Sequence, residues 1–132
     1  MPVSKCTIAI VEDDASFRRA LARLLHVSGF DAHTFASAEE FLGSAAPGSH
    51  ACLILNINLP GMSGFELVEH LTTSVPPPPA IFITAQDADS LRERASRIPN
   101  SVYLSKPIPA AALLEAVRSL LRLSGTCGGS SR

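Results

Sequence analysis

The chain has 132 residues, of which 46% are hydrophobic and 17% charged, and its net charge is −1. This length suits one domain that buries roughly two-thirds of its unfolded surface, so the core needs no disulfide or metal to hold it. The composition excludes a disordered chain, and the lack of a basic run leads us to expect no direct nucleic acid binding by this domain.

The first part of the chain predicts a strand, a helix and a second strand. Residues 6–11 form a β-branched apolar run that is typical of a buried strand. Apolar residues at helical spacing follow, and we expect that helix to begin after Asp14 and to stop near Gly29. Residues 31–35 alternate only weakly, which indicates a less buried strand at the edge of a sheet.

The middle of the chain predicts two further strands. Residues 37–40 fit a capping box that opens a short helix. Residues 51–55 are the most apolar strand, which we place at the centre because strands buried on both faces lose their alternation. A helix follows the next proline-glycine break. The four prolines at 76–79 predict a stiff connector, rather than a ligand for a polyproline-binding domain, before a strand over 80–84.

The last part of the chain predicts a polar helix over residues 90–97, a strand over 101–104 and an amphipathic helix over 110–123. Residues 1–123 therefore form one domain, and residues 124–132 predict a flexible tail or a truncated linker. Five strand–helix repeats predict an α/β fold, a doubly wound five-stranded parallel sheet with helices on both faces. Ligands of such sheets bind at the carboxyl ends of the strands.

Three cysteines, Cys6, Cys52 and Cys127, are scattered and form no Cys-x-x-Cys pair. We expect Cys6 and Cys52 to fill apolar positions at or near strands, and the odd count favours a reducing, cytoplasmic location. Residues 1–10 lack the apolar core of a signal peptide, and no apolar run approaches the ~18 residues that span a bilayer. We therefore expect no membrane association.

Polar side chains follow four of the five strands and together predict one site. They are Glu12 and Asp13 after the first strand, Asn56 and Asn58 after the third, Thr84 after the fourth and Lys106 after the fifth. Adjacent carboxylates are costly unless a cation neutralises them, and oxygens of this kind suit Mg²⁺. A hydroxyl and an ammonium opposite the metal suit the oxygens of a phosphoryl group. The set describes a phosphoryl site that lacks an anionic nucleophile at Asn56.

Each of these residues also has an ordinary structural explanation. An acidic pair at a helix start complements the helix dipole, and an asparagine after a strand forms an Asx turn. Thr84 suits a turn hydroxyl and Lys106 a solvated surface cation. Their joint occurrence at four strand ends is what favours a site.

The sequence resembles the receiver domain of bacterial two-component response regulators. The resemblance covers about residues 5–123 and is carried by IVEDD (10–14), LILNINLPGMSG (53–64), FITAQ (82–86) and YLSKP (103–107). It implies a flavodoxin-like receiver fold with the strand order 2-1-3-4-5. It also implies a function in phosphorelay signal transduction, with a sensor histidine kinase or phosphotransfer protein as the partner.

The resemblance assigns a metal site to the first and third strand ends. Glu12 and Asp13 match the acidic pair of the family, with Asp13 as a direct Mg²⁺ ligand. Asn58 would give its backbone carbonyl to the same ion. Asn56 stands at the position of the aspartate that the family phosphorylates.

The resemblance assigns the remaining residues to phosphoryl binding and switching. Thr84 matches the hydroxyl that senses the phosphoryl group, and Lys106 matches the lysine that pairs with it. The bond between Lys106 and Pro107 is expected to be cis. Tyr103 matches the aromatic switch residue that swings inward on activation.

Asn56 is the main departure from the family pattern. Its amide oxygen is neutral and a poor nucleophile, so we expect phosphorylation to be blocked and Mg²⁺ binding to be weak. The asparagine belongs either to a natural pseudo-receiver or to an engineered substitution. A second departure, residues 98–100, changes the face of the fourth helix, fifth strand and fifth helix. The family resemblance implies that an output domain or a second copy of the chain binds this face, and residues 98–100 differ from the family there.

The motifs favour a non-enzymatic interaction module over two other classes of function. A small phosphatase or hydrolase on the same architecture is the alternative, but the sequence has no GxSxG elbow and no plausible Cys/His pair, and its four histidines are scattered. A nucleotide-binding module would need a GxGxxG or GxxxxGK[ST] motif after the first strand, where three acids stand instead.

Overall fold

Strands and helices alternate along the computed structural model, which describes residues 7–44, 50–71 and 78–124. The strands are β1 (Thr7–Val11), β2 (Asp31–Phe35), β3 (Cys52–Asn56), β4 (Ala80–Thr84) and β5 (Ser101–Ser105). The helices are α1 (Ala15–Val27), α2 (Ala38–Leu42), α3 (Gly64–Leu71), α4 (Asp89–Ser96) and α5 (Ala110–Ser124). Each element lies within about one residue of its predicted place, and Asn56 is the last residue of β3. Cys6, Cys127, two of the connector prolines and the predicted tail from 125 onward lie outside the described residues.

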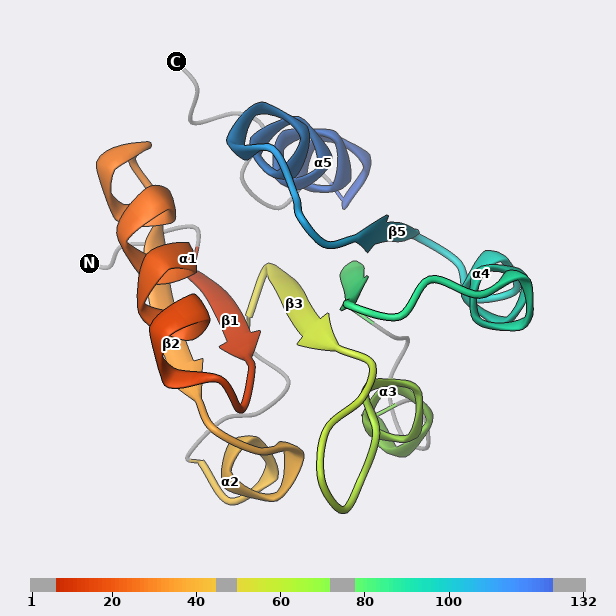
Figure 1. Ribbon diagram of the computed structural model, residues 1–132. Coiled ribbons are helices and arrows are strands. Elements are labelled where there is room, and N and C mark those ends of the chain that lie inside the picture. Colours follow the sequence, from red (N-terminus) through yellow and green to blue (C-terminus); the bar gives the residue numbers. More distant parts are fainter. Residues whose placement is uncertain (1–6, 45–49, 72–77, 125–132) are drawn as a thin grey trace.

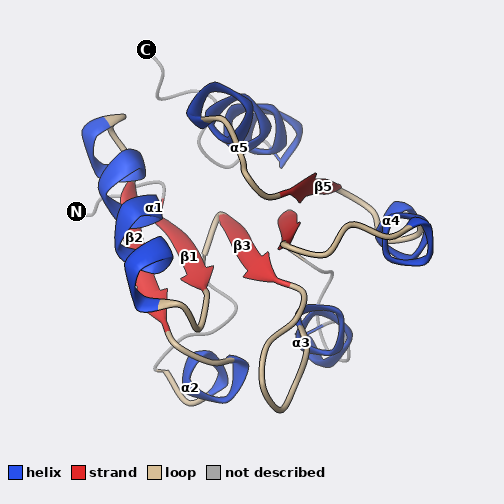
Figure 2. Ribbon diagram, viewed as in Figure 1, coloured by secondary structure: helices blue, strands red, loops and turns tan. Residues whose placement is uncertain are grey.

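The five strands form one parallel sheet with the order β2-β1-β3-β4-β5. This confirms the predicted α/β fold and its strand order. Every residue of β3 and β4 is buried, whereas β2 at the edge has exposed positions. Helices α1 and α5 cover one face of the sheet, and α2, α3 and α4 cover the other (Figures 1 and 2).

The strands divide the core into two apolar layers. Ala9 and Val11 of β1 face the layer under α2, α3 and α4, while Ile8 and Ile10 face the layer under α1 and α5. Successive side chains of a strand point to opposite faces of the sheet. A strand that is buried on both faces therefore needs apolar residues at successive positions. The strands are thereby fixed in register, and their carboxyl ends meet at one edge.

Local signals fix where α1 begins and ends. The Asp14 carboxylate accepts a hydrogen bond from the Phe17 amide at 3.2 Å, as expected of the cap. Gly29 has φ +96°, the left-handed conformation that ends helices at low cost when the residue is glycine. Helix α3 has a reciprocal cap between Ser63 and Glu66 that the sequence analysis did not predict.

Gly64, the first residue of α3, lies directly against the end of β3. A Cβ atom built on Gly64 would lie 2.7 Å from the backbone oxygen of Asn56, which is closer than side-chain carbons approach backbone. The Gly64 amide also donates to the Ile57 oxygen at 3.1 Å. The glycine therefore lets the helix start close to the polar end of the central strand.

We predict that Gly64→Ala lowers the free energy of unfolding by about 1–3 kcal/mol, because the new methyl group must push the Asn56 carbonyl or the helix aside. The matched control is Gly43→Ala at the end of α2. Gly43 has φ −80° and its nearest foreign atom to a Cβ is the Glu39 oxygen at 3.5 Å, so this variant should change stability by less than about 1 kcal/mol. Urea denaturation measures both, and equal values for the two variants would contradict the close approach.

Candidate functional site

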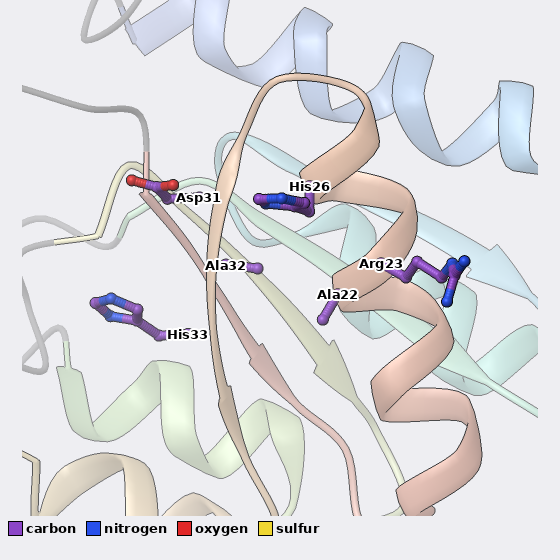
Figure 3. Close-up of a pocket in the computed structure, with 6 residues that line it drawn as sticks. All are labelled: Ala22, Arg23, His26, Asp31, Ala32 and His33. Carbon is purple, nitrogen blue, oxygen red and sulfur yellow. The ribbon is translucent and has the colours of Figure 1, made fainter.

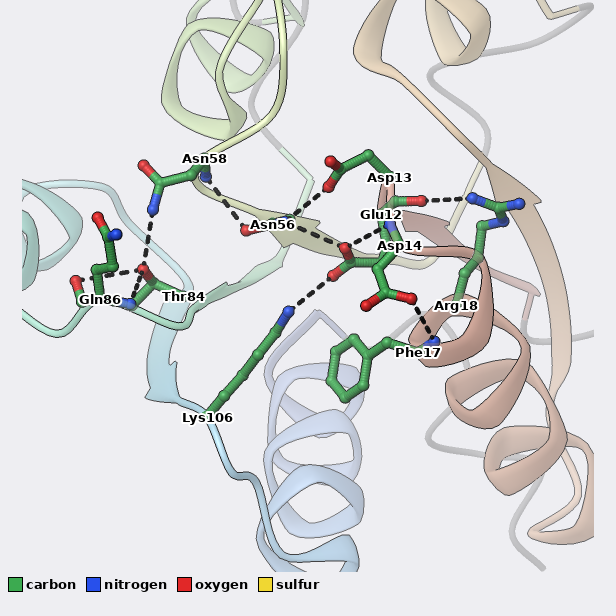
Figure 4. Close-up of polar contacts among 10 residues, drawn as sticks. All are labelled: Glu12, Asp13, Asp14, Phe17, Arg18, Asn56, Asn58, Thr84, Gln86 and Lys106. Atoms are coloured by element: carbon green, nitrogen blue, oxygen red, sulfur yellow. Dashed lines mark hydrogen bonds and ion pairs between the residues drawn. The ribbon is translucent and has the colours of Figure 1, made fainter.

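The side chains predicted to form a site converge at the carboxyl edge of the sheet. Glu12 follows β1, Asn56 ends β3, Thr84 ends β4 and Lys106 follows β5. Figure 4 shows Glu12, Asp13 and Lys106 gathered around Asn56. Glu12, Asn56 and Thr84 are also the polar residues that are buried among those the structure describes, so the edge concentrates buried polarity at one place.

Glu12 has no exposed surface and is surrounded by hydrogen-bond donors. Its Oε2 accepts from the Asp14 amide at 3.0 Å and from Asn56 Nδ2 at 3.1 Å. Its Oε1 accepts from Lys106 Nζ at 3.3 Å. A buried carboxylate is tolerated only when it is paired and hydrogen-bonded, and these three donors meet that need.

The Asn56 side chain lies between two carboxylates and is only 7% exposed. Its Nδ2 donates to Glu12 Oε2 and to Asp13 Oδ1, both at 3.1 Å, while its Oδ1 accepts from the Asn58 amide at 3.2 Å. The opposite amide orientation would place its oxygen against two carboxylates and its NH₂ against a backbone donor. The hydrogen-bond network therefore decides which atom faces the acids.

Thr84 is joined to the same site through Asn58. The Asn58 side-chain Nδ2 donates to Thr84 Oγ1 at 3.3 Å. The hydroxyl also accepts from the Gln86 amide at 3.0 Å and lies 3.3 Å from the Gln86 oxygen, to which it donates. The hydroxyl is thus engaged on the side of the β4–α4 loop.

Lys106 is held by an acid on one side and an aromatic ring on the other. Besides its contact with Glu12, its Nζ lies 4.2 Å from the centre of the Phe17 ring. Its backbone amide donates to the Thr84 oxygen at 2.8 Å, and its bond to Pro107 is cis, as expected. Lys106 is therefore an ordered part of the site and is only 22% exposed.

Glu12 and Asp13 are the two carboxylates beside Asn56, and its amide group lies between them. No group of three or more His, Cys, Asp or Glu side chains is placed to hold an ion in the described part of the chain. The Asn56 amide also turns N–H groups, rather than an oxygen, toward the carboxylates. A divalent cation would have to displace that amide before it could contact both acids.

Tyr103 on β5 is bonded to the start of α4. Its hydroxyl donates to Asp87 Oδ1 at 2.8 Å and accepts from the Ala88 amide at 3.4 Å. Arg92 lies 4.7 Å from the centre of the ring and also pairs with Asp87. Tyr103 was predictable from its motif, whereas Asp87, which lies just beyond the FITAQ motif, and Arg92, which lies within α4, were not predicted because neither comes directly after a strand.

The same contacts shift two ionisation equilibria. The hydrogen bond from Tyr103, assisted by Arg92, holds the pKa of the Asp87 carboxyl below its usual value. Burial raises the pKa of Tyr103, and the hydrogen bond to Asp87 raises it further. The tyrosine therefore stays protonated where an isolated one would ionise.

Two further features lie away from the carboxyl edge. A pocket is lined by Ala22, Arg23, His26, Asp31, Ala32 and His33, residues of α1 and β2 that Figure 3 shows around the edge strand. His33 Nδ1 and His50 Nε2 lie 3.2 Å apart, so two histidines that looked scattered meet in the fold. The pairing of β1 with both β2 and β3 explains this approach, since His50 stands just before β3.

Cys52 is a buried free thiol, as expected of an apolar filler. Burial raises the pKa of this thiol to about 12, so it carries no reactive thiolate near neutral pH. Within the described residues, no helix is long and apolar enough to cross a membrane.

Comparisons with known proteins place this architecture in context. A family model described as "Response regulator receiver domain" matches residues 8–118. Nodulation protein W of Bradyrhizobium diazoefficiens is 37% identical over 114 residues, covering 86% of this chain and 50% of that protein. Transcriptional regulatory protein FixJ of Azorhizobium caulinodans is 31% identical over 121 residues, covering 92% of this chain and 57% of that protein. The chain spans about half the length of these relatives.

Solved structures agree with the sequence matches. Response regulator StyR is 38% identical with a TM-score of 0.82, and the match covers 96% of this chain and 64% of StyR. A response regulator receiver protein from Burkholderia phymatum is 35% identical with a TM-score of 0.76, covering 89% and 96% of the two chains. Vibrio cholerae CheY4, at 22% identity and a TM-score of 0.78, shares the fold.

We predict that Tyr103 ionises above the usual tyrosine pKa of about 10, and that Asp87→Asn lowers this pKa without restoring it fully, because burial remains. The chain has a single tyrosine, so ultraviolet absorbance of tyrosinate reports on Tyr103 alone. Because the folded-state pKa is raised, the stabilising contribution is complete below about pH 10 and is lost as pH rises through the folded pKa.

The control is Asp89→Asn, which removes an exposed carboxylate two residues away and should leave the titration unchanged. An unchanged midpoint in Asp87→Asn would contradict the assigned hydrogen bond.

Proposed function

Because the chain belongs to the response regulator receiver domain family, which serves two-component signal transduction, we propose that it acts by protein–protein interaction while phosphotransfer at Asn56 is blocked. One observation carries the proposal. Asn56 ends the central strand among two acids, and its NH₂ group donates to Glu12 and Asp13. A neutral amide therefore stands where the family resemblance places the phosphorylated aspartate.

The chemistry of the family explains why an amide blocks the reaction. A carboxylate attacks the phosphorus of a phosphohistidine and forms an acyl phosphate. The amide oxygen is neutral and already accepts a hydrogen bond from the Asn58 amide, so it is a poor nucleophile. Its NH₂ group faces the acids and has no lone pair to offer.

We assign the surrounding residues to the roles that the family resemblance gives them. Lys106 is proposed to pair with a phosphoryl group, Thr84 to sense it, and Tyr103 to report the state at the surface. Two contacts support these roles: Lys106, which follows β5 at the sheet edge, pairs with Glu12, and Tyr103 on β5 is bonded to Asp87 in the loop between β4 and α4. With an amide at position 56, these residues keep their contacts because no phosphoryl group is attached to change them.

Receiver domains generally bind Mg²⁺ at the phosphorylation site, and we propose that this chain binds it weakly. Glu12, Asp13 and the Asn58 carbonyl are the groups that would hold the ion. A carboxylate ~4 Å from a divalent ion contributes on the order of 8 kcal/mol gross at an effective dielectric near 20, most of it offset by desolvation. Asn56 supplies no such charge, and the ion must also displace its amide.

We further propose a non-enzymatic, cytoplasmic module whose partner is a sensor histidine kinase or a phosphotransfer protein. A possible output domain or second copy would use the face of α4, β5 and α5. The buried free thiol of Cys52 supports a reducing location. No observation favours the hydrolase alternative, since the contact of His33 with His50 lies away from the carboxyl edge.

We predict that a small-molecule phosphodonor with Mg²⁺ leaves the mass of the wild-type chain unchanged, because position 56 has no anionic oxygen. The Asn56→Asp variant should gain about 80 Da, one phosphoryl group. Intact mass spectrometry measures both, and peptide mapping locates the modification. A stoichiometric gain on Asn56 of the wild type would refute the proposed block.

We predict that Asn56→Asp binds Mg²⁺ at least about tenfold more tightly than the wild type but melts at a lower temperature in chelator. The third carboxylate attracts the ion when metal is present and repels Glu12 and Asp13 when it is absent. Calorimetric titration and thermal melts measure the two effects. Equal melting temperatures in chelator and equal Mg²⁺ affinities for the two proteins would contradict this electrostatic explanation.

A further inference from the structure

We propose that the two asparagines of the Asn56-Ile57-Asn58 segment act as built-in substitutes for ligands, so that the carboxyl edge of the sheet keeps one conformation without metal or phosphate. The Asn56 amide takes the place of a cation between Glu12 and Asp13, and the Asn58 side chain engages the Thr84 hydroxyl. The proposal depends on the proposed function in one respect: both assume that this edge of the sheet is the phosphoryl site of the family.

Glu12 is completely buried and needs hydrogen-bond donors, and the exposed Asp13 lies next to it in the chain, so the two carboxylates repel each other unless a donor or a cation lies between them. The Asn56 NH₂ group reaches both with one nitrogen, at 3.1 Å each, and Lys106 Nζ supplies a full positive charge to Glu12 at 3.3 Å. The amide dipole and the ammonium together give the acids what an ion would give them.

The hydroxyl of Thr84 at the end of β4 is engaged by three hydrogen-bonding groups. Thr84 Oγ1 has contacts with the Asn58 side chain and with both backbone groups of Gln86. These contacts use the donor and acceptor capacity of the hydroxyl. The Asn58 side chain therefore ties the loop after β3 to Thr84 at the end of β4, a residue 26 positions further along the chain.

A hydrogen bond between the two asparagines connects these two contacts. Asn56 Oδ1 accepts from the Asn58 backbone amide at 3.2 Å, so the residue that satisfies the acids also positions the residue that holds Thr84. A continuous set of hydrogen bonds runs from Glu12 through both asparagines to the β4–α4 loop. Each bond joins groups of this chain alone, which makes the arrangement independent of added ligands.

The test is the thermal melt of the full chain in chelator and in about 10 mM Mg²⁺, together with hydrogen exchange of single amides. The wild type should melt within about 1 °C in both buffers, because an ion gains little by displacing the amide. The Asn56→Ala variant should melt roughly 3–8 °C lower in chelator and recover part of that loss in Mg²⁺, since the ion can then lie between the two acids.

Exchange of two backbone amides reports the two contacts separately. In Asn56→Ala the Asn58 amide loses its acceptor and should exchange at least about tenfold faster. In Asn58→Ala the Gln86 amide should exchange faster, because the Thr84 hydroxyl becomes free to rotate. The Ile57 amide, which donates to the Ile83 oxygen at 2.8 Å, is the internal control and should keep its protection in both variants.

The control variant is Gln86→Ala, which removes an exposed amide side chain on the same edge but keeps the backbone contacts with Thr84. This variant should melt like the wild type.

Two results would overturn the proposal. One is a wild-type melting temperature that rises in Mg²⁺ as much as that of Asn56→Ala, and the other is an Asn56→Ala protein that melts like the wild type in chelator. If Asn56→Ala does not fold, Asn56→Asp in chelator keeps the side-chain shape without the donors and should show the same lowered melting temperature. The phosphodonor experiment is unaffected by these outcomes, so the block at Asn56 and the ligand substitution can fail independently.

Discussion

A buried negative charge at the end of β1 is the constraint on which the carboxyl edge of the sheet depends. Glu12 has no contact with solvent, so each of its oxygens needs a donor from the protein. One donor is local, the Asp14 amide two residues away, whereas the other two come from distant segments, Asn56 at the end of β3 and Lys106 after β5. The parallel sheet brings these distant groups to the Glu12 carboxylate because its strands end at the same edge.

The polar edge and the apolar layers also depend on one another at Gly64. Helix α3 begins against the backbone of Asn56, and this closeness is possible because Gly64 has no side chain. The helix then places Phe65, Leu67 and Val68 in the layer that also contains Leu55 and Phe82. Packing of that layer thereby fixes the end of β3, and the fixed strand end holds the Asn56 side chain between the acids. The ion pairs of Arg94 and Arg97 with exposed carboxylates carry little energetic weight, and Arg94 also lies 4.6 Å from the centre of the Phe65 ring.

Much of the fold was predictable from the sequence, because strand and helix periodicity and cap residues such as Asp14 act locally. The grouping of Glu12, Asn56, Thr84 and Lys106 was also predictable, since parallel strand ends share an edge. What could not be predicted is how the side chains turn. The amide orientation of Asn56 and the reach of Asn58 to Thr84 depend on rotamers that tertiary neighbours select. The partners of Tyr103 and the approach of His33 to His50 likewise involve residues without a distinctive local pattern.

The backbone hydrogen bond from Ile57 to Ile83 bears on how the amide at position 56 survives over time. Asparagine side chains deamidate when the nitrogen of the following residue attacks the side-chain carbonyl carbon and closes a succinimide ring, which opens to aspartate or isoaspartate. Here that nitrogen belongs to a buried, β-branched isoleucine and is held toward β4 at 2.8 Å from its acceptor. We therefore expect Asn56 to deamidate slowly, because the hydrogen bond between β3 and β4 holds the attacking nitrogen of Ile57.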